Sequence, residues 1–303
     1  MRICSLLPSA TEIVFALEQQ DSLVGVTHEC DYPPEACRIP KVTRTNIAVG
    51  LASREIDAAV RSTLDTTGSL YELDLPLIER LAPDLVLTQR LCDVCAVSFD
   101  RVEQSVADLP LQPRVLNLEP HSLEDILASI RAVAEAIGCE AGAVIRGLRA
   151  RIDSVAAKTS NVTQRPRVFC MEWVDPPYCG GHWMKELVEI AGGRDELANH
   201  HRPSSRIEWR RVLDFAPEVI VLTCCGFDLT RCRQEVEILA RFEGAADLPA
   251  AKAGRVYATD GSGYFSRPGP RIVDSLEILT HLLHPELFPP PRLEAAFCPV
   301  TLR

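Results

Sequence analysis

The 303-residue sequence lacks the features that mark several large classes of protein. No apolar run approaches the roughly 20 residues that a helix needs to cross a bilayer. The net charge of −10 argues against nucleic acid or an anionic membrane as the main partner. The opening residues also lack the basic, apolar and small-residue parts of a signal peptide, because Met1 and Arg2 run directly into a strand-like segment. We therefore expect a cytoplasmic protein that is not embedded in a membrane, with a periplasmic location as the alternative if the true start lies upstream.

Common catalytic motifs are also missing. Residues 180–183 (GGHW) lack the Lys-Ser/Thr pair of a P-loop, and no G-x-G-x-x-G follows a predicted strand. No serine lies in a G-x-S-x-G turn, the motif that carries the nucleophile of α/β hydrolases. This absence favours a binding protein over an enzyme.

Twelve cysteines are too few for a disulfide scaffold in a chain of this length. Cys4, Cys139 and Cys170 lie among apolar residues and are expected to be buried. Eight others fall in predicted loops: Cys30, Cys37, Cys92, Cys95, Cys179, Cys224, Cys225 and Cys232. So many loop thiols would risk mispairing in an exported protein, which favours reduced cysteines in the cytosol.

One short pattern occurs twice, 134 residues apart: APDLVLT at residues 82–88 and APEVIVLT at residues 216–223. Each copy follows an amphipathic segment, so each predicts a helix, a Pro-acid turn and a short buried parallel strand. Each copy leads into a pair of cysteines: Cys92 and Cys95, or Cys224 and Cys225. Because open α/β sheets bind ligands beyond the carboxyl ends of their strands, both copies are expected to direct these loops at one cleft.

The order of predicted elements gives an α/β fold with two Rossmann-like lobes. Each lobe is expected to hold a parallel central sheet, with one long helix joining the lobes and a ligand cleft between them. The predicted boundaries are an N-terminal lobe at 1–137, a connecting helix at 138–160, a C-terminal lobe at 161–284 and an extended tail at 285–303.

This order of elements resembles the cobalamin and iron-chelate binding proteins of ABC importers, and the vitamin B12-binding branch in particular. The likeness covers about residues 3–284. The segments that carry it are residues 5–12 (SLLPSATE), 24–26 (VGV), 31–34 (DYPP), 81–86 (LAPDLV), 176–178 (PPY), 187–193 and 217–223, and Arg267 with Pro270 and Arg271.

The resemblance implies a rigid two-lobed protein that holds cobalamin or a related metal chelate and meets an ABC permease. The family docks on the permease through one acidic residue on each lobe. The aligned positions here hold Pro76 and Arg210, with Glu79 and Glu208 close by. Two cleft positions that are aromatic in the B12 binders are Glu29 and Gln89 in this sequence. The candidate ligand-binding residues are Ser9, His28, Glu29, Gln89, Cys92, Glu172, Trp173, Tyr178, His182, Trp183, Cys224, Tyr264, Phe265 and Arg267.

The motif Cys92-x-x-Cys95 follows a predicted strand and precedes a predicted helix, a setting that favours a thiolate. It fits a redox dithiol, half of a metal site, or two small packed residues. His28 and Cys30 come from a loop of the same lobe, so His28, Cys30, Cys92 and Cys95 are a candidate zinc or iron site. His28 is alternatively an axial ligand to a cobalt or iron chelate, or a loop histidine bonded to a nearby carbonyl.

Aromatic residues gather after the first predicted strand of the second lobe. Trp173, Tyr178 and Trp183 have faces that suit a flat corrin or porphyrin, although Trp183 is alternatively a core anchor. Arg267 offers a partner for carboxylate, phosphate or amide oxygens of a ligand. We thus expect a corrinoid or metal-chelate binding protein, with a cytosolic chelatase- or reductase-like enzyme that uses Cys92 and Cys95 as the alternative.

Overall fold

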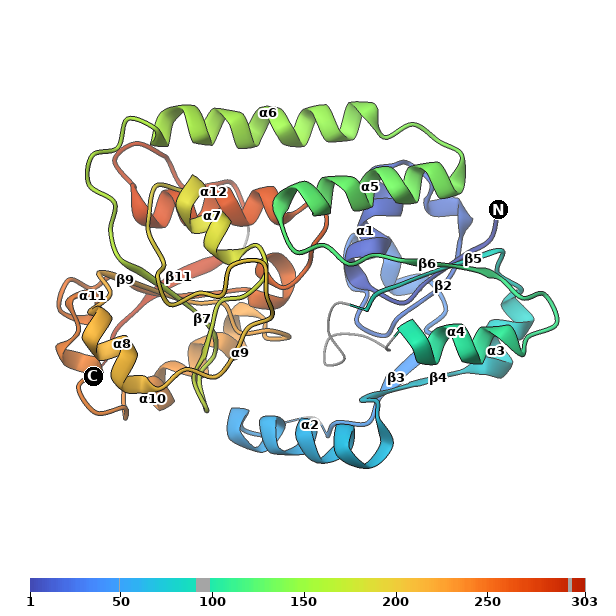
Figure 1. Cartoon of the computed structure of the whole chain (residues 1–303), viewed down its shortest axis with the longest axis horizontal. Coiled ribbons are helices and arrows are strands. Elements are labelled where there is room, and N and C mark those ends of the chain that lie inside the picture. Colours follow the sequence, from blue (N-terminus) through green and yellow to red (C-terminus); the bar gives the residue numbers. More distant parts are fainter. Residues whose placement is uncertain (49, 91–98, 294–295, 303) are drawn as a thin grey trace. The chain divides into compact units, whose positions relative to one another are not determined.

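The computed structural model describes residues 1–48, 50–90, 99–293 and 296–302. The chain divides into two compact units. Unit 1 holds residues 1–120 and 124–147, and unit 2 holds residues 121–123 and 148–303. Each unit has its own central sheet with helices on both faces, so the predicted α/β fold class is confirmed (Figure 1).

Unit 1 is built on a four-stranded parallel sheet with the order β2-β1-β5-β6. Its strands are β1 (Ile3–Ser5), β2 (Leu23–Val26), β5 (Leu85–Thr88) and β6 (Arg114–Asn117). Its helices are α1 (Pro8–Ala16), α3 (Leu75–Leu81), α4 (Phe99–Ala107) and α5 (Leu123–Ile137), with short turns η1 (Gln20–Ser22) and η2 (Pro34–Arg38).

The alternating side chains of β1 and β5 supply the two faces of this sheet. Cys4 and Val86 point to the face covered by α3 and α4, where they pack with Ile78 and Val102. Helices α1 and α5 cover the opposite face (Figure 1). Because both faces are covered, the strands are short continuous apolar runs, as expected for a parallel sheet.

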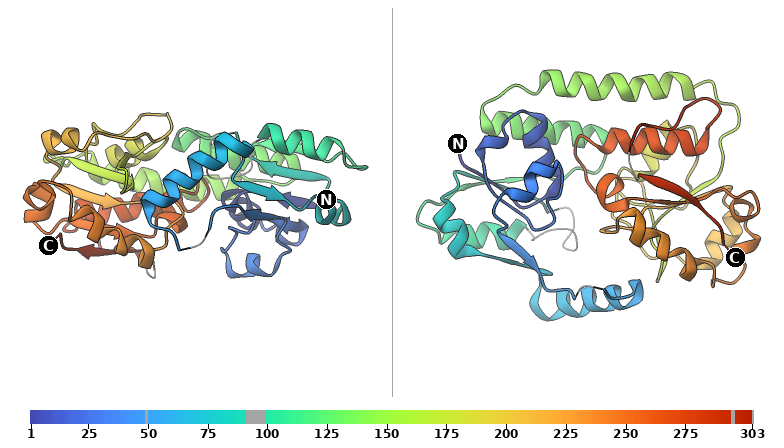
Figure 2. Two further views of the ribbon diagram at one scale, coloured as in Figure 1. Left: turned by 90° about the horizontal axis from the view of Figure 1, so that it is seen from below. Right: turned by 180° about the vertical axis from the view of Figure 1, so that it is seen from behind.

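An insertion extends unit 1 away from this sheet (Figures 1 and 2). It consists of the antiparallel pair β3 (Thr43–Thr45) and β4 (Tyr71–Leu73), joined through helix α2 (Ser53–Thr67). The sequence predicts this helix at residues 53–64, and the structure ends it at Gly68, whose φ of 69° suits glycine.

Unit 2 is built on a five-stranded sheet with the order β11-β10-β9-β7-β8. The strands are β7 (Val168–Trp173), β8 (Tyr178–Cys179), β9 (Val219–Leu222), β10 (Val256–Thr259) and β11 (Phe297–Val300). The helices are α7 (Met184–Ile190), α8 (Trp209–Phe215), α9 (Leu229–Gln234), α10 (Val236–Leu239), α11 (Pro249–Lys252) and α12 (Ile272–Leu283), with turns η3 (Ala245–Asp247) and η4 (Gly261–Phe265). Helices α7 and α12 lie on one face of the sheet, and α8, α9 and α10 on the other (Figure 1).

The two sequence repeats fold into the same helix–turn–strand unit. Helices α3 and α8 end at Ala82 and Ala216, which both adopt a left-handed conformation with φ of 44° and 50°. In unit 1 the acid of the turn, Asp84, accepts a 2.7 Å hydrogen bond from the backbone N–H of Arg2. In unit 2 Glu218 accepts the equivalent 2.9 Å bond from Arg167.

Helix α6 (Gly142–Thr159) follows α5 and lies within the segment predicted as the connecting helix, residues 138–160. The boundary between the units falls inside α6, after Gly147. In unit 2 the guanidinium of Arg151 on α6 binds Asp274 at 2.5 Å and Glu277 at 2.8 Å, which attaches α6 to α12.

The tail is more than an extended surface segment. Its strand β11 pairs antiparallel with β10, and Ala296 and Leu302 are buried. Pro299 is tolerated in β11 because an edge strand has one row of backbone groups outside the ladder.

Candidate functional site

The candidate residues of unit 1 lie at the carboxyl edge of its sheet. Ser9 is in the first turn of α1 after β1, His28 follows β2, and Gln89 follows β5. These three strands are neighbours, so their ends meet at one edge. Ser9 and Gln89 are almost fully buried there, whereas His28 is partly exposed and Glu29 is exposed.

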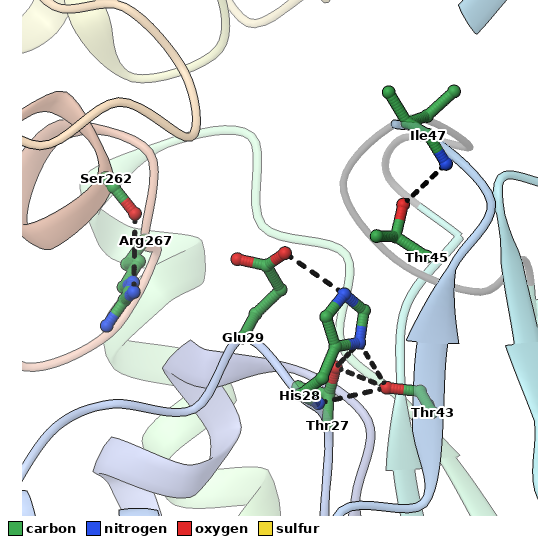
Figure 3. Close-up of polar contacts among 8 residues, drawn as sticks. All are labelled: Thr27, His28, Glu29, Thr43, Thr45, Ile47, Ser262 and Arg267. Atoms are coloured by element: carbon green, nitrogen blue, oxygen red, sulfur yellow. Dashed lines mark hydrogen bonds and ion pairs between the residues drawn. The ribbon is translucent and has the colours of Figure 1, made fainter. Parts of the chain in front are cut away.

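Thr43 of β3 fixes the ring of His28 (Figure 3). Its hydroxyl oxygen is 2.7 Å from His28 Nδ1 and 2.8 Å from the hydroxyl of Thr27, and it accepts a 3.0 Å bond from the His28 backbone N–H. The other ring nitrogen, Nε2, is 3.1 Å from Glu29 Oε1. Tyr71 packs beside the imidazole, with ring centroids 5.6 Å apart.

This arrangement couples the tautomer of His28 to the direction of one hydroxyl. Since the backbone N–H of His28 occupies one lone pair of the Thr43 oxygen, one acceptor and one donor position remain for Thr27 and Nδ1. If Thr43 donates to Nδ1, the proton is on Nε2 and faces Glu29. If Nδ1 donates to Thr43, Nε2 has a free lone pair for a metal.

Of the predicted metal group, only His28 and Cys30 lie among the described residues. The Cys30 thiol lies 3.1 Å from the hydroxyl of Thr11 on α1. Burial raises the pKa of the neighbouring Cys4 thiol to about 12, and Cys30 adds to this shift. Cys92 and Cys95 lie outside the described residues, so their part in the prediction stays open. In the described part of the chain, no three His, Cys, Asp or Glu side chains are grouped to hold a metal ion.

In unit 2, Glu172 at the end of β7 holds a tight turn. Its carboxylate accepts a 2.8 Å hydrogen bond from the backbone N–H of Gly181. Burial raises the pKa of Glu172, and bonds from Gly181 and the side chain of Ser204 oppose that shift. A Cβ at Gly181 would lie 2.2 Å from the backbone nitrogen of Ser204, so only glycine fits there. Glu172 therefore positions the loop between β8 and α7.

The aromatic candidates separate into a partly exposed group and a buried group. The ring of Trp173 is 4.8 Å from that of Phe227, and its indole N–H donates to the carbonyl of Asp175 at 3.1 Å. Tyr178 is partly exposed, and its hydroxyl oxygen accepts a 3.4 Å hydrogen bond from Nε of Arg206. Trp183 is only 5% exposed, and its indole N–H donates to the Phe265 carbonyl, which favours the core-anchor alternative.

His182 lies against this core in a left-handed conformation, with φ of 52°. Its ring stacks on Trp183 at 5.4 Å and lies 5.6 Å from the ring of His121. Burial lowers the pKa of His182 to about 4, and the nearby His121 adds to this shift. His182 is therefore neutral at physiological pH.

The remaining candidates of unit 2 are buried. Tyr264 and Phe265 form part of turn η4, and Cys224 is fully buried after β9. Arg267 is 4% exposed, and its Nη2 donates to the hydroxyl of Ser262 at 3.4 Å (Figure 3). Contact of Arg267 or Cys224 with a ligand stays a prediction.

Four residues that contact the candidates were not identified from the sequence: Thr43, Tyr71, His121 and Phe227. Thr43 and Tyr71 come from the paired insertion strands β3 and β4, whose short polar segments give no strong strand pattern. Phe227 lies four residues after the end of the second sequence repeat, and this proximity was the available signal.

Comparisons with known proteins agree on one family. The model of a family described as periplasmic binding protein matches residues 3–262. The ABC transporter substrate-binding lipoprotein YvrC of Bacillus subtilis is 25% identical over 95% of this chain and 81% of its own length. The vitamin B12-binding protein of Vibrio parahaemolyticus is 24% identical over 92% of this chain and 88% of its own. The periplasmic heme-binding protein RhuT of Roseiflexus has a TM-score of 0.70 at 23% identity, covering 94% and 98% of the two chains.

These relatives show that the predicted cytoplasmic location is wrong. They are a lipoprotein and periplasmic binding proteins, which points to an extracytoplasmic location. The argument from mispaired loop thiols is weakened because four of these cysteines, Cys30, Cys179, Cys224 and Cys232, are buried, although Cys37 is exposed. Among the described helices, none is long and apolar enough to cross a bilayer.

The comparisons also decide between binding and catalysis. Members of the matched family bind substrates for ABC importers, so the prediction of a binding protein is confirmed and the chelatase or reductase alternative is disfavoured. A small-molecule ligand and an ABC permease are the partners that follow from this role. The chain belongs to the periplasmic binding protein family and is a substrate-binding protein.

Proposed function

We propose that this protein binds a metal chelate of the corrin or porphyrin class and delivers it to an ABC permease. The names of its relatives include vitamin B12-binding and heme-binding proteins. The single observation in this chain that carries the proposal is the held imidazole of His28 at the carboxyl edge of the unit 1 sheet. An imidazole fixed through Nδ1 is a good Nε2 donor to cobalt or iron.

Glu29 gates that donor. Nε2 is buried and lies 3.1 Å from a carboxylate oxygen of Glu29, whose side chain is 44% exposed. Departure of Glu29 and a proton shift to Nδ1, which then donates to Thr43, would leave Nε2 free for a metal centre. In this proposal Glu29 covers the imidazole nitrogen until a ligand displaces it.

The partly exposed ring of Trp173 supplies apolar contact in unit 2. Its orientation is fixed by the bond to the Asp175 carbonyl and by Phe227, over which the Arg231 guanidinium lies at 4.2 Å. A fixed aromatic ring can stack on a macrocycle without a large loss of side-chain entropy.

The test is reconstitution of the purified protein with cyanocobalamin and with hemin, followed by gel filtration and absorbance spectroscopy. We expect one of the two to co-elute in a 1:1 ratio and to quench tryptophan fluorescence. Retention of neither ligand would refute the proposed ligand class.

Variants test the role of His28. His28→Ala should remove the shift of the hemin Soret band or of the cobalamin visible bands, and Glu29→Ala should speed that shift because Nε2 is uncovered. His200→Ala, which removes an exposed histidine of unit 2, is the control and should change neither. An unchanged spectrum in His28→Ala with ligand still bound would refute axial ligation while leaving the ligand class intact.

The proposal also assigns the contact with the permease. The aligned docking positions hold exposed Pro76 and Arg210, so we propose that exposed Glu79 and Glu208 replace them. Charge reversal of both glutamates to lysine should abolish stimulation of permease ATPase activity without changing ligand binding, whereas Glu196→Lys, at another exposed site, should not. Full stimulation by the double variant would contradict this assignment.

A further inference from the structure

An arginine packed on an aromatic pair lies at the carboxyl edge of the unit 2 sheet. Strands β7 and β9 are parallel neighbours, with Trp173 at the end of β7 and Phe227 in the loop after β9. The backbone N–H of Cys225 donates to the carbonyl of Glu172 at 3.1 Å, so this loop runs beside Trp173. The two rings are 4.8 Å apart, and the guanidinium of Arg231 on α9 lies over the Phe227 ring at 4.2 Å. Ligands of α/β sheets bind at this edge.

Glu235 holds Arg231 in this position. Its carboxylate pairs with the guanidinium and is 1% exposed, whereas the arginine side chain is 28% exposed. Oε2 of Glu235 has no hydrogen-bond partner in the part of the chain that the structure describes, so the buried carboxylate depends on this ion pair. Because an unpaired buried charge is costly, the pair fixes the guanidinium against Phe227. The Asp228 carboxylate, which accepts a 2.7 Å bond from the backbone N–H of Arg231, fixes the first turn of the helix.

A guanidinium held by one carboxylate can still bind another. It has five N–H donors in one plane, which suits contact with more than one anion. Arg151 in the same unit shows this, because it binds both Asp274 and Glu277. Glu235 contacts Arg231 through Nη1, and part of the arginine side chain remains exposed to solvent. Arg231 can therefore donate to an anion that approaches from solvent.

We propose that Arg231 binds a carboxylate substituent of the ligand that stacks on Trp173. This inference rests on the proposed function and narrows it to a macrocycle with acidic side chains. A heme carries free carboxylates, whereas the side chains of cobalamin are amides, so a porphyrin is favoured over a corrin. Arg267, the residue that the sequence suggests for this contact, is only 4% exposed. Since Arg231 and Trp173 are both held in place before binding, little side-chain entropy is lost when the ligand arrives.

The first experiment changes the ligand and leaves the protein intact. The affinity of the purified full chain is measured for hemin and for hemin dimethyl ester, whose carboxylates are blocked, by quenching of tryptophan fluorescence. We expect the ester to bind roughly 10- to 100-fold more weakly, because a hydrogen bond between charged groups is lost. Equal affinities, or retention of cyanocobalamin without hemin, would overturn the inference and leave the proposed ligand class intact. Retention of neither ligand would refute the proposed function itself.

Variants then test the assignment to Arg231. The double variant Arg231→Met/Glu235→Gln removes both charges, so it leaves no buried carboxylate unpaired, and it should bind hemin and its ester equally. Arg231→Lys keeps a cation beside Glu235 but loses the planar donors, so it should retain part of the preference for hemin. Arg233→Met, which removes an exposed arginine of the same helix, is the control and should retain all of it.

Arg206, which lies beside Tyr178, is the competing arginine of this unit. Loss of the preference for hemin in Arg206→Met, with the preference retained in the Arg231 variants, would overturn the assignment. Urea unfolding of each variant, followed by circular dichroism, checks that the affinities are those of folded proteins.

Discussion

Replacement of His182 with asparagine should remove a defined part of the pH dependence of stability. The ring of His182 lies between Trp183 and His121 in unit 2, and its pKa is lowered from 6.5 to about 4 by burial and by His121. Because the folded-state pKa lies below the unfolded value, the folded protein binds fewer protons than the unfolded chain. The stabilisation of the folded protein by the neutral ring is therefore complete above pH 6.5 and is lost as the pH falls toward 4.

The magnitude follows from the size of the shift. A difference of 2.5 pKa units corresponds to at most about 3.4 kcal/mol in the free energy of unfolding, at about 1.36 kcal/mol per unit. The ring is only partly buried, so solvent screening reduces the expected value to about 1.5–2 kcal/mol. Asparagine is the suitable replacement because it does not titrate and accepts the left-handed φ of 52° at this position.

Urea unfolding at pH 7.5 and pH 4.5, followed by circular dichroism, measures the effect. We expect the loss of unfolding free energy between the two pH values to be about 1.5 kcal/mol smaller in His182→Asn than in the wild type. His200→Asn, on an exposed loop, is the control and should behave as the wild type. Equal pH dependence in His182→Asn and the wild type would refute the burial argument.

Three further predictions concern stability. Arg151→Met breaks the two ion pairs to α12 and should lower the free energy of unfolding, measured with urea, by about 1 kcal/mol. The decrease should be smaller at 1 M salt. The carboxylate of Asp195 accepts hydrogen bonds from three backbone N–H groups. Asp195→Asn leaves one of these N–H groups without a good acceptor, so it should lower the free energy of unfolding by about 1–3 kcal/mol. Burial raises the pKa of Asp195 to about 6. The wild-type carboxyl therefore stabilises the folded protein below pH 4, and this stabilisation is lost as the pH rises through 6. The variant should lack this pH dependence of the free energy of unfolding. Gly181→Ala drives a Cβ into the backbone at Ser204 and should lower the melting temperature by several degrees, whereas Gly147→Ala, with open space around it, should raise it slightly. A Gly181→Ala protein as stable as the wild type would contradict the packing of that turn.

The sequence predicted the repeated parts of the fold most accurately. The pattern at residues 82–88 and 216–223 marks a helix end, a turn and a strand, and all three are set by local chemistry. A buried apolar segment after a Pro-acid turn has few conformations in which its backbone N–H and C=O groups are hydrogen-bonded. The strand can therefore be predicted from a few consecutive residues. Helix α6 likewise lies within the predicted helix at residues 138–160, because its apolar residues recur at helical spacing.

The parts that were missed depend on distant partners. Strand β11 exists because β10 offers it a free edge, and nothing in residues 297–300 alone specifies that pairing. Strands β3 and β4 pair across helix α2, so their partners lie far apart in the sequence. For the same reason, the sequence could name His28 but not Thr43, which determines what the imidazole can do.

Burial also decides what a functional residue type means. Trp183 and Arg267 have the right chemistry for a macrocycle with carboxylate groups, yet the core of unit 2 surrounds both. The cysteines give the clearest case. Counted along the chain, loop thiols suggested a reducing compartment, but burial limits the partners that each thiol can reach. Cys30, Cys179, Cys224 and Cys232 are all buried, so a high cysteine count need not cause mispairing in an oxidising compartment. A count of cysteines along the chain therefore does not indicate the compartment until the burial of each thiol is known.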